Sequence, residues 1–247
     1  MIDKMRLFII ECVGPMDLLQ DRSEAKALER MCHIIGHEVA ILTAYCAEDL
    51  EKYCDYISSI DDIHATRTKQ RPLCIHLSAH GNERGVSFGR DFLNWQQLFM
   101  AMDPLFKDMS QYNGEVMISL SACGAGNQTL VNEIEREIQQ HHEHHFDDSY
   151  DQKPHDHEPA HHVTRPTLTP PVSPPAYIFV TQGSQGDDVI YWDDATVSWT
   201  IFYHRLAKLR TIHDEAVYRI LDDIEHAADT LLRAYRWDAL TQRYIKY

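Results

Sequence analysis

Short apolar runs alternate along the chain with longer segments whose apolar residues recur every three or four positions. Runs of the first kind are typical of buried strands, and segments of the second kind are typical of helices packed by one face. We predict strands over Met5–Ile10, Glu38–Thr43, Leu73–Ser78, Glu115–Ser121 and Tyr177–Thr181, with a short terminal strand over Arg243–Tyr247. We predict helices over Ser23–Ile34, Glu48–Ile57, Trp95–Met100, Asn127–Gln140, Val197–Leu209 and Glu215–Tyr235. Such alternation predicts an α/β fold, with a mostly parallel central sheet and helices on both faces.

Residues 141–175 interrupt this pattern. They hold eight histidines and seven prolines but few large apolar residues. A segment of this composition cannot bury enough surface to offset the entropy lost on ordering it. We therefore expect a flexible, exposed insertion within one domain spanning residues 1–247, since the sheet has to continue beyond it.

Charge and hydropathy narrow the range of partners. The 38 acidic residues outnumber the 23 basic ones, for a formal charge of −15. Such a chain repels phosphate backbones and anionic lipid, so we expect neither nucleic acid nor a membrane as a partner. No apolar run approaches the roughly 18 residues that span a bilayer, and the first residues lack a signal-peptide layout. The expected location is cytoplasmic.

Two other kinds of site are disfavoured by the spacing of their candidate residues. The six cysteines include no C-x-x-C pair, so we expect neither a zinc ribbon nor a thioredoxin-type site. In the cytosol we expect them to be free thiols. The histidines of residues 141–175 could bind zinc or nickel, but tracts of this kind bind metal weakly without a dedicated role. Gly124-Ala125-Gly126 resembles a dinucleotide-binding turn, yet Thr129 replaces the third glycine and no strand ending in an acid follows. We expect no metal and no cofactor.

A histidine and a cysteine follow two of the predicted strands. Leu73–Gly85 has the sequence LCIHLSAHGNERG, with His80 just past the strand, and Ile118–Gly126 has the sequence ISLSACGAG, with Cys123 in the same place. Because the carboxyl ends of parallel strands gather at one edge of a sheet, the two side chains are expected to meet. A histidine can deprotonate a thiol, and the amides of Gly81 and Cys123 could stabilise an oxyanion.

The simpler interpretation is that Cys123 is one more buried thiol and His80 an ordinary loop histidine. Three features argue against it. Both residues end strands, both adjoin a glycine, and their separation of 43 residues leaves room for one crossover between neighbouring strands. The pair is therefore a candidate catalytic dyad.

At these residues the chain resembles caspase-like cysteine peptidases, the group that also holds metacaspases and bacterial CHAT proteases. Ser121-Ala122-Cys123-Gly124 is similar to the caspase motif Q-A-C-[RQG]-G, whose histidine lies about 50 residues upstream. Cys74–Gly89 resembles the strand and hairpin around the caspase histidine, and Tyr177–Leu206 resembles the start of the small subunit. The resemblance covers most of Met5–Leu209. It implies a caspase-like three-layer sandwich in which His80 and Cys123 form the dyad and Gly81 contributes an oxyanion amide.

The expected substrate pocket departs from the caspase pattern. The resemblance implies two arginines and a glutamine for aspartate specificity, but Ser121 stands at the glutamine position and Asp193 follows Trp192 where an arginine is expected. Arg22 matches the other arginine, across a loop of different length. Asp187, Asp188 and Asp193 could instead favour a basic residue before the scissile bond, or form only a solvated loop.

These observations predict a cysteine endopeptidase, a thiol protease that hydrolyses a protein or peptide substrate through a thioester. The family implies activation by cleavage within residues 141–175 or by a protein partner, and, for a bacterial protein, a role in defence or cell death. The alternative is a catalytically silent caspase-like module that binds a partner. Caspases end in further strands that pair in the dimer. Because Glu215–Tyr235 has a helical pattern, we do not expect this chain to dimerise through a shared sheet edge.

Overall fold

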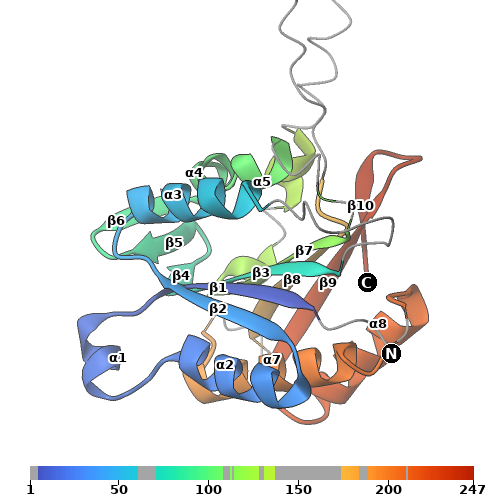
Figure 1. Cartoon of the computed structure of the whole chain (residues 1–247), viewed down its shortest axis with the longest axis horizontal. Coiled ribbons are helices and arrows are strands. Elements are labelled where there is room, and N and C mark those ends of the chain that lie inside the picture. Colours follow the sequence, from blue (N-terminus) through green and yellow to red (C-terminus); the bar gives the residue numbers. More distant parts are fainter. Residues whose placement is uncertain are drawn as a thin grey trace, which may run out of the picture.

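A seven-stranded sheet forms the centre of the molecule (Figure 1). The structure, a computed structural model, describes residues 5–60, 71–107, 112, 114–127, 131–136, 174–183, 189–209 and 211–247. The strands are β1 (Arg6–Cys12), β2 (Glu38–Thr43), β3 (Leu73–Ala79), β7 (Val116–Ser121), β8 (Tyr177–Gly183), β9 (Thr230–Asp238) and β10 (Arg243–Lys246). Their order is β10-β9-β8-β7-β3-β1-β2. Within this sheet β1, β2, β3, β7 and β8 are parallel, whereas β9 and β10 are antiparallel to their neighbours.

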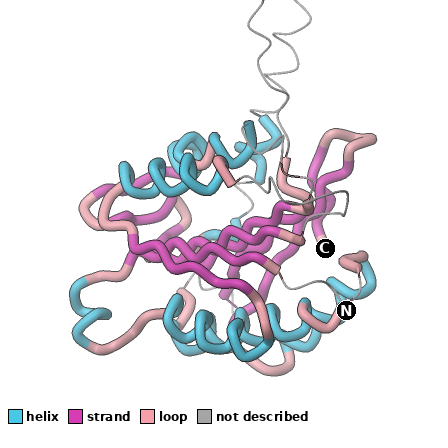
Figure 2. The backbone as a smooth tube through the Cα atoms, viewed as in Figure 1, coloured by secondary structure: helices cyan, strands magenta, loops and turns pink. Residues whose placement is uncertain are grey.

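Helices cover both faces of the sheet, so the fold has three layers (Figure 2). One face carries α3 (Ala47–Ser58), α4 (Trp95–Ala101) and α5 (Pro104–Lys107), and the other carries α2 (Glu24–Ile35), α7 (Trp192–Leu206) and α8 (Asp214–Glu225). The small helix α1 (Pro15–Leu19) follows β1, and the 3₁₀ turn η2 (Ala125–Asn127) follows β7. A separate three-stranded sheet consists of β4 (Gly81–Asn82), β5 (Gly85–Phe88) and β6 (Asp91–Asn94). The predicted α/β class with a mostly parallel, doubly covered sheet is confirmed.

Alternation along the central strands divides the core into two clusters. In β3, Leu73, Ile75 and Leu77 pack in the cluster beneath α3, α4 and α5, and Cys74 packs in the cluster beneath α2, α7 and α8. All four side chains are fully buried. The same alternation turns His76 toward α2 and α7, where its ring contacts Glu24 and Tyr203. A strand buried on both faces belongs inside a covered parallel sheet.

Local signals place the start and end of α2 where the sequence predicts them. Ser23 caps the helix by accepting a hydrogen bond from the Lys26 N–H at 3.2 Å. Gly36 ends it with φ at 97°, in the left-handed region that glycine adopts without a steric penalty.

The last predicted helix is wrong in its second half. Helix α8 ends at Glu225, and residues Thr230–Asp238 form β9 beside β8. Leucine, alanine and arginine favour helices locally, but the antiparallel pairing with β8 buries Leu232 and Ala234 in one core cluster and Tyr235 in the other. The terminal strand is confirmed as β10. The sheet therefore ends in two antiparallel strands, and the argument from helicity against a shared sheet edge does not hold.

Two other predictions differ in extent. The helix predicted over Val197–Leu209 begins five residues earlier, at Trp192. Of the helix predicted over Asn127–Gln140, Asn127 ends the 3₁₀ turn η2 and residues 131–136 are helical. Residues 128–130 and 137–140 lie outside the described residues. Residues 141–173, nearly all of the expected insertion, also lie outside them. Across the described ranges, no helix is both long and apolar enough to cross a membrane.

Candidate active site

The carboxyl ends of β1, β3 and β7 meet at one edge of the central sheet. These strands are neighbours, since β3 pairs with β1 on one side and with β7 on the other. Beyond them opens a pocket of about 250 Å³. Its lining comprises Glu11, Cys12, Val13, Asp17, Arg22, Glu24, Ser78, Ala79, His80, Ser121, Ala122, Cys123, Ile190, Tyr191, Trp192 and Ala195. The structure therefore brings His80 and Cys123 together in one pocket.

Two glycines allow the loops that carry these residues to approach each other. A Cβ at Gly81 would lie 2.6 Å from the carbonyl oxygen of Cys123, which is too close for any side chain. Gly124 has φ at +75°, and a Cβ there would collide with the backbone of Asn82. The glycines beside the histidine and the cysteine are thus required by the packing of the two loops.

Cys123 and His80 each contact a different partner in this structure. The Cys123 sulfur accepts a hydrogen bond from the Ile190 N–H at 3.4 Å and lies 3.9 Å from the Ile190 carbonyl oxygen. His80 Nε2 lies 2.8 Å from Asp17 Oδ2, and the imidazole side chain is 70% exposed. Catalytic hydrogen bonds often form only when substrate binds, so these contacts describe a resting arrangement of the two groups.

The backbone before Cys123 is anchored to β8. The Thr181 hydroxyl accepts a hydrogen bond from the Ala122 N–H at 3.1 Å. The same hydroxyl lies 3.1 Å from the Ala122 carbonyl oxygen and 3.3 Å from that of Leu120, either of which can accept its proton. A fully buried threonine therefore holds the end of β7 immediately before the thiol.

Two amides are available next to the thiol. The Ser87 N–H donates to the His80 carbonyl oxygen at 2.8 Å, which makes Gly81 and Val86 a non-hydrogen-bonded pair of the antiparallel ladder. The Gly81 N–H is therefore not used by that ladder. Among the described residues, the Cys123 N–H has no acceptor either. Such amides are suited to stabilise an oxyanion, the role that the sequence predicts for them.

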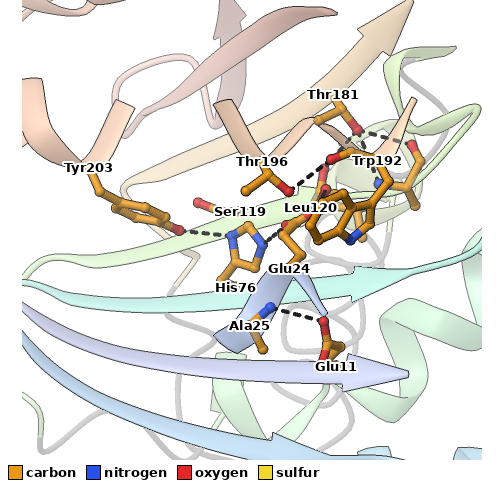
Figure 3. A network of polar contacts seen from close by, with 12 residues as sticks. Glu11, Glu24, Ala25, His76, Ser119, Leu120, Thr181, Trp192, Thr196 and Tyr203 are labelled. Carbon is orange, nitrogen blue, oxygen red and sulfur yellow. Dashed lines mark hydrogen bonds and ion pairs between the residues drawn. The ribbon is translucent and has the colours of Figure 1, made fainter. Parts of the chain in front are cut away.

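A buried chain of polar side chains (Figure 3) reaches the pocket through Glu24 and Ser121, which belong to its lining. Glu24 Oε2 accepts a hydrogen bond from the Ser121 hydroxyl at 2.9 Å, and Glu24 Oε1 lies 2.6 Å from His76 Nε2. His76 is fully buried, and its Nδ1 lies 2.9 Å from the Tyr203 hydroxyl. A neutral His76 satisfies every contact when Nε2 donates to Glu24 and Nδ1 accepts from Tyr203. Glu24 then accepts twice, as a carboxylate does.

Glu11 is a second buried carboxyl group in the lining. Its Oε1 accepts a hydrogen bond from the Ala25 N–H at 2.9 Å, and its Oε2 accepts one from the Ser23 hydroxyl at 2.7 Å. Burial raises the pKa of Glu11, and these two hydrogen bonds partly offset that shift. The carboxyl group thus also ties β1 to the first turn of α2.

Of the residues predicted to bind substrate, some line the pocket and others do not. Ser121 and Arg22 line the pocket, Ser121 as a buried residue and Arg22 as an exposed residue. Asp193 is exposed in the first turn of α7 and does not line the pocket, although its neighbour Trp192 does. Asp187 and Asp188 lie outside the described residues.

Three carboxyl groups of the lining escaped the sequence analysis: Glu11, Asp17 and Glu24. Glu11 ends β1 at the same sheet edge, a position that could have drawn attention to it. Glu24 stands in the first turn of α2, where acids are common because of the helix dipole, so its type carried no signal.

The comparisons with known proteins identify no family: no protein-family model matches the chain, and no curated protein matches it. Within the described part of the chain, no group of three or more histidine, cysteine, aspartate or glutamate side chains could hold a metal ion. All six cysteines are free.

Proposed function

We propose that the protein is a caspase-like cysteine endopeptidase that acts in the cytoplasm, with Cys123 as nucleophile and His80 as general base. The observation that supports this best is the placement of these two side chains in one pocket. They follow adjacent parallel strands, on loops whose contact depends on Gly81 and Gly124. A structural thiol would need neither a histidine in the same pocket nor amides that lack an acceptor among the described residues.

In the proposed reaction, His80 removes the Cys123 thiol proton as the sulfur attacks the substrate carbonyl carbon. The Gly81 and Cys123 amides donate to the oxygen that becomes negatively charged. Protonated His80 then donates its proton to the leaving amine, the C–N bond breaks, and a thioester remains on Cys123. Water, deprotonated by His80, hydrolyses the thioester and regenerates the thiol.

The acidic lining favours a basic side chain in the pocket. The carboxylate of Glu24 belongs to the lining and Glu11 lies in the same lining, so a lysine or arginine side chain would enter toward negative charge. This extends the preference first suggested by Asp188 and Asp193, and assigns it to residues of the lining. Arg22 opposes it at an exposed position. Aspartate specificity is disfavoured, because the pocket lacks the glutamine and is lined by a carboxylate.

The surroundings of the Cys123 thiol also fit the alternative function, a catalytically silent binding module. The thiol is engaged by the backbone of Ile190 and makes no hydrogen bond to a described side chain. A catalytically silent module that binds a protein partner would tolerate this arrangement permanently. In a peptidase, the segment carrying Ile190 has to move when substrate binds, so activation by a partner or by cleavage within residues 141–175 would act on it.

Cleavage of a proteome-derived peptide library, analysed by mass spectrometry, tests the proposal. We expect new cleavage sites with the wild-type protein, mostly after lysine or arginine, and none with Cys123→Ala. The control is Cys46→Ala, since Cys46 is a partly exposed free thiol whose side chain makes no cap hydrogen bond for α3. That variant should cleave like the wild type. Equal cleavage by wild type and Cys123→Ala would refute the assigned nucleophile, and no cleavage with any candidate activator would favour the binding module.

A further inference from the structure

The carboxylate of Asp17 makes a direct contact with the proposed general base. Asp17 Oδ2 lies 2.8 Å from His80 Nε2. The carboxylate side chain is 24% exposed, whereas the imidazole is 70% exposed, so the contact covers mainly the acid. Both residues line the same pocket as Cys123.

Helix α1 turns the Asp17 side chain toward the protein and its apolar side chains toward solvent. Of its five residues, Asp17 is the one that is not exposed, while the apolar side chains of Met16, Leu18 and Leu19 point to solvent. A short helix normally turns its apolar residues inward and its acid outward. The reversal indicates that the contact made by Asp17, and not apolar burial, determines how α1 lies against the body.

The backbone around Asp17 is fixed from two sides. Its carbonyl oxygen accepts a hydrogen bond from the Arg22 N–H at 2.8 Å, which connects α1 to the approach of α2. A Cβ on Gly14 would lie 3.1 Å from Asp17 Oδ2 and 3.9 Å from His80 Nε2, so the glycine leaves room for the pair. A larger residue at position 14 would crowd the carboxylate against the imidazole.

We infer that Asp17 is a positioning residue that sets the tautomer of His80 and completes a Cys123–His80–Asp17 triad. A carboxylate accepts hydrogen bonds, so Nε2 has to carry the proton in this contact. In a neutral imidazole, Nδ1 is then the unprotonated nitrogen and the one able to take the Cys123 proton. The carboxylate also stabilises the imidazolium that forms as the thiol is deprotonated. This inference rests on the proposed function.

A purely structural ion pair at this site would behave differently. Exposed pairs of this kind contribute little to stability, so loss of Asp17 should leave folding almost unchanged. A role in fixing the tautomer would instead appear in the turnover number. Asp17→Asn is the informative change, because its amide can donate to Nε2 and stabilise the wrong tautomer.

The test compares Asp17→Asn with Asp21→Asn, a control that removes a charge four residues away. Asp21 pairs with Lys26 at 3.3 Å on the surface and, at φ of 54°, occupies a conformation that asparagine tolerates. With a peptide cut by the wild type, we expect Asp17→Asn to lower kcat by about 10- to 100-fold with little change in KM. The control should retain the wild-type kcat.

A second measurement needs no substrate. Alkylation of Cys123 by iodoacetamide, followed by mass spectrometry, should slow severalfold in Asp17→Asn at pH 6, where the thiolate depends on pairing with the imidazolium, and be unchanged at pH 9. Unchanged kcat together with unchanged alkylation at pH 6 would overturn the inference, as would a rise in kcat, which would make Asp17 an inhibitory latch. If neither the wild type nor the variants cleave peptides but alkylation of Cys123 still depends on Asp17, the proposed function fails and the pairing of Asp17 with His80 stands.

Discussion

At the scale of single residues, His76 is notable because it is a fully buried polar side chain in the middle of the central sheet. Such a group is tolerated only when its hydrogen bonds are made. Glu24 satisfies one ring nitrogen and Tyr203 the other, and Cys74 lies 3.6 Å from the same Tyr203 hydroxyl. This part of the pocket lining is therefore held from within the core, and it can lose its geometry through residues that never touch a substrate.

Removing the Tyr203 hydroxyl should show this dependence. Tyr203→Phe leaves His76 Nδ1 buried without its partner, so we expect the free energy of unfolding to fall by about 1–3 kcal/mol. The matched control is Tyr56→Phe, which removes the hydroxyl of a tyrosine that is 66% exposed and should change stability by less than about 0.5 kcal/mol. Urea unfolding of both variants gives the comparison. Equal stability of Tyr203→Phe and wild type would mean that the chain of hydrogen bonds contributes nothing.

The sequence predicts some residues of the site and misses others. His80 and Cys123 were found because each follows an apolar run and adjoins a glycine, and both features depend on neighbours in sequence. Glu24 and Asp17 were not found, because only the tertiary fold brings α2 and α1 to the pocket. A carboxylate acquires its role there from contacts 52 and 63 residues away along the chain, to His76 and His80.

At the scale of elements, His37 connects three parts of the fold. It lies between α2 and β2, its Nδ1 accepts the Met5 N–H at 3.1 Å just before β1, and its Nε2 lies 3.4 Å from the Tyr203 carbonyl oxygen in α7. This arrangement requires the neutral ring. Burial holds the pKa of His37 below its usual range, and the hydrogen bond to Tyr203 only partly offsets the shift.

Stability should consequently depend on pH through His37. Below about pH 6.5 the unfolded chain binds a proton at this residue and the folded protein does not, so the free energy of unfolding falls as the pH decreases. Between pH 7.5 and 5.5, we expect the wild type to lose more free energy of unfolding than His37→Gln, by at most about 1.4 kcal/mol. Denaturant unfolding at both values measures this loss. Exposed His33 supplies the control, since His33→Gln should keep the wild-type pH dependence. Equal losses in all three proteins would contradict the assignment.

Prediction of the elements was reliable wherever local and tertiary preferences agree. The runs that became β1, β2, β3, β7 and β8 are apolar and β-branched, and the fold buries them between two layers of helices. Residues 230–238 show the opposite case, because leucine, alanine and arginine favour a helix until β8 offers an antiparallel partner. Helix α1 gave no periodic signal, since its five residues bury no apolar side chain.

At the scale of the whole molecule, the site combines two parts of the chain that lie on either side of residues 141–173. The preceding part supplies β1, β3 and β7, and with them His80 and Cys123. The following part supplies Thr181, which anchors the end of β7, and Ile190, which contacts the thiol. The two parts also share both core clusters, so neither cluster can form from one part alone.

A chain cut within residues 141–173 should therefore remain one folded molecule. Strands β7 and β8 pair in parallel across the cut, with Met117 opposite Tyr177 and Leu120 opposite Val180. The Tyr244 N–H also donates a hydrogen bond to Glu135 Oε1 at 2.6 Å. With a specific protease site inserted in this segment, we expect the two fragments to elute together in native size exclusion and to separate in denaturant. Wild-type chain exposed to the same protease is the control, and separate elution without denaturant would contradict the expectation.

Peptide cleavage measured before and after the cut then tests the activation hypothesis, since a cut that frees the Cys123 thiol from Ile190 should raise the rate. If the intact chain is already fully active, activation by this cleavage is excluded, and a protein partner becomes the candidate that moves Ile190.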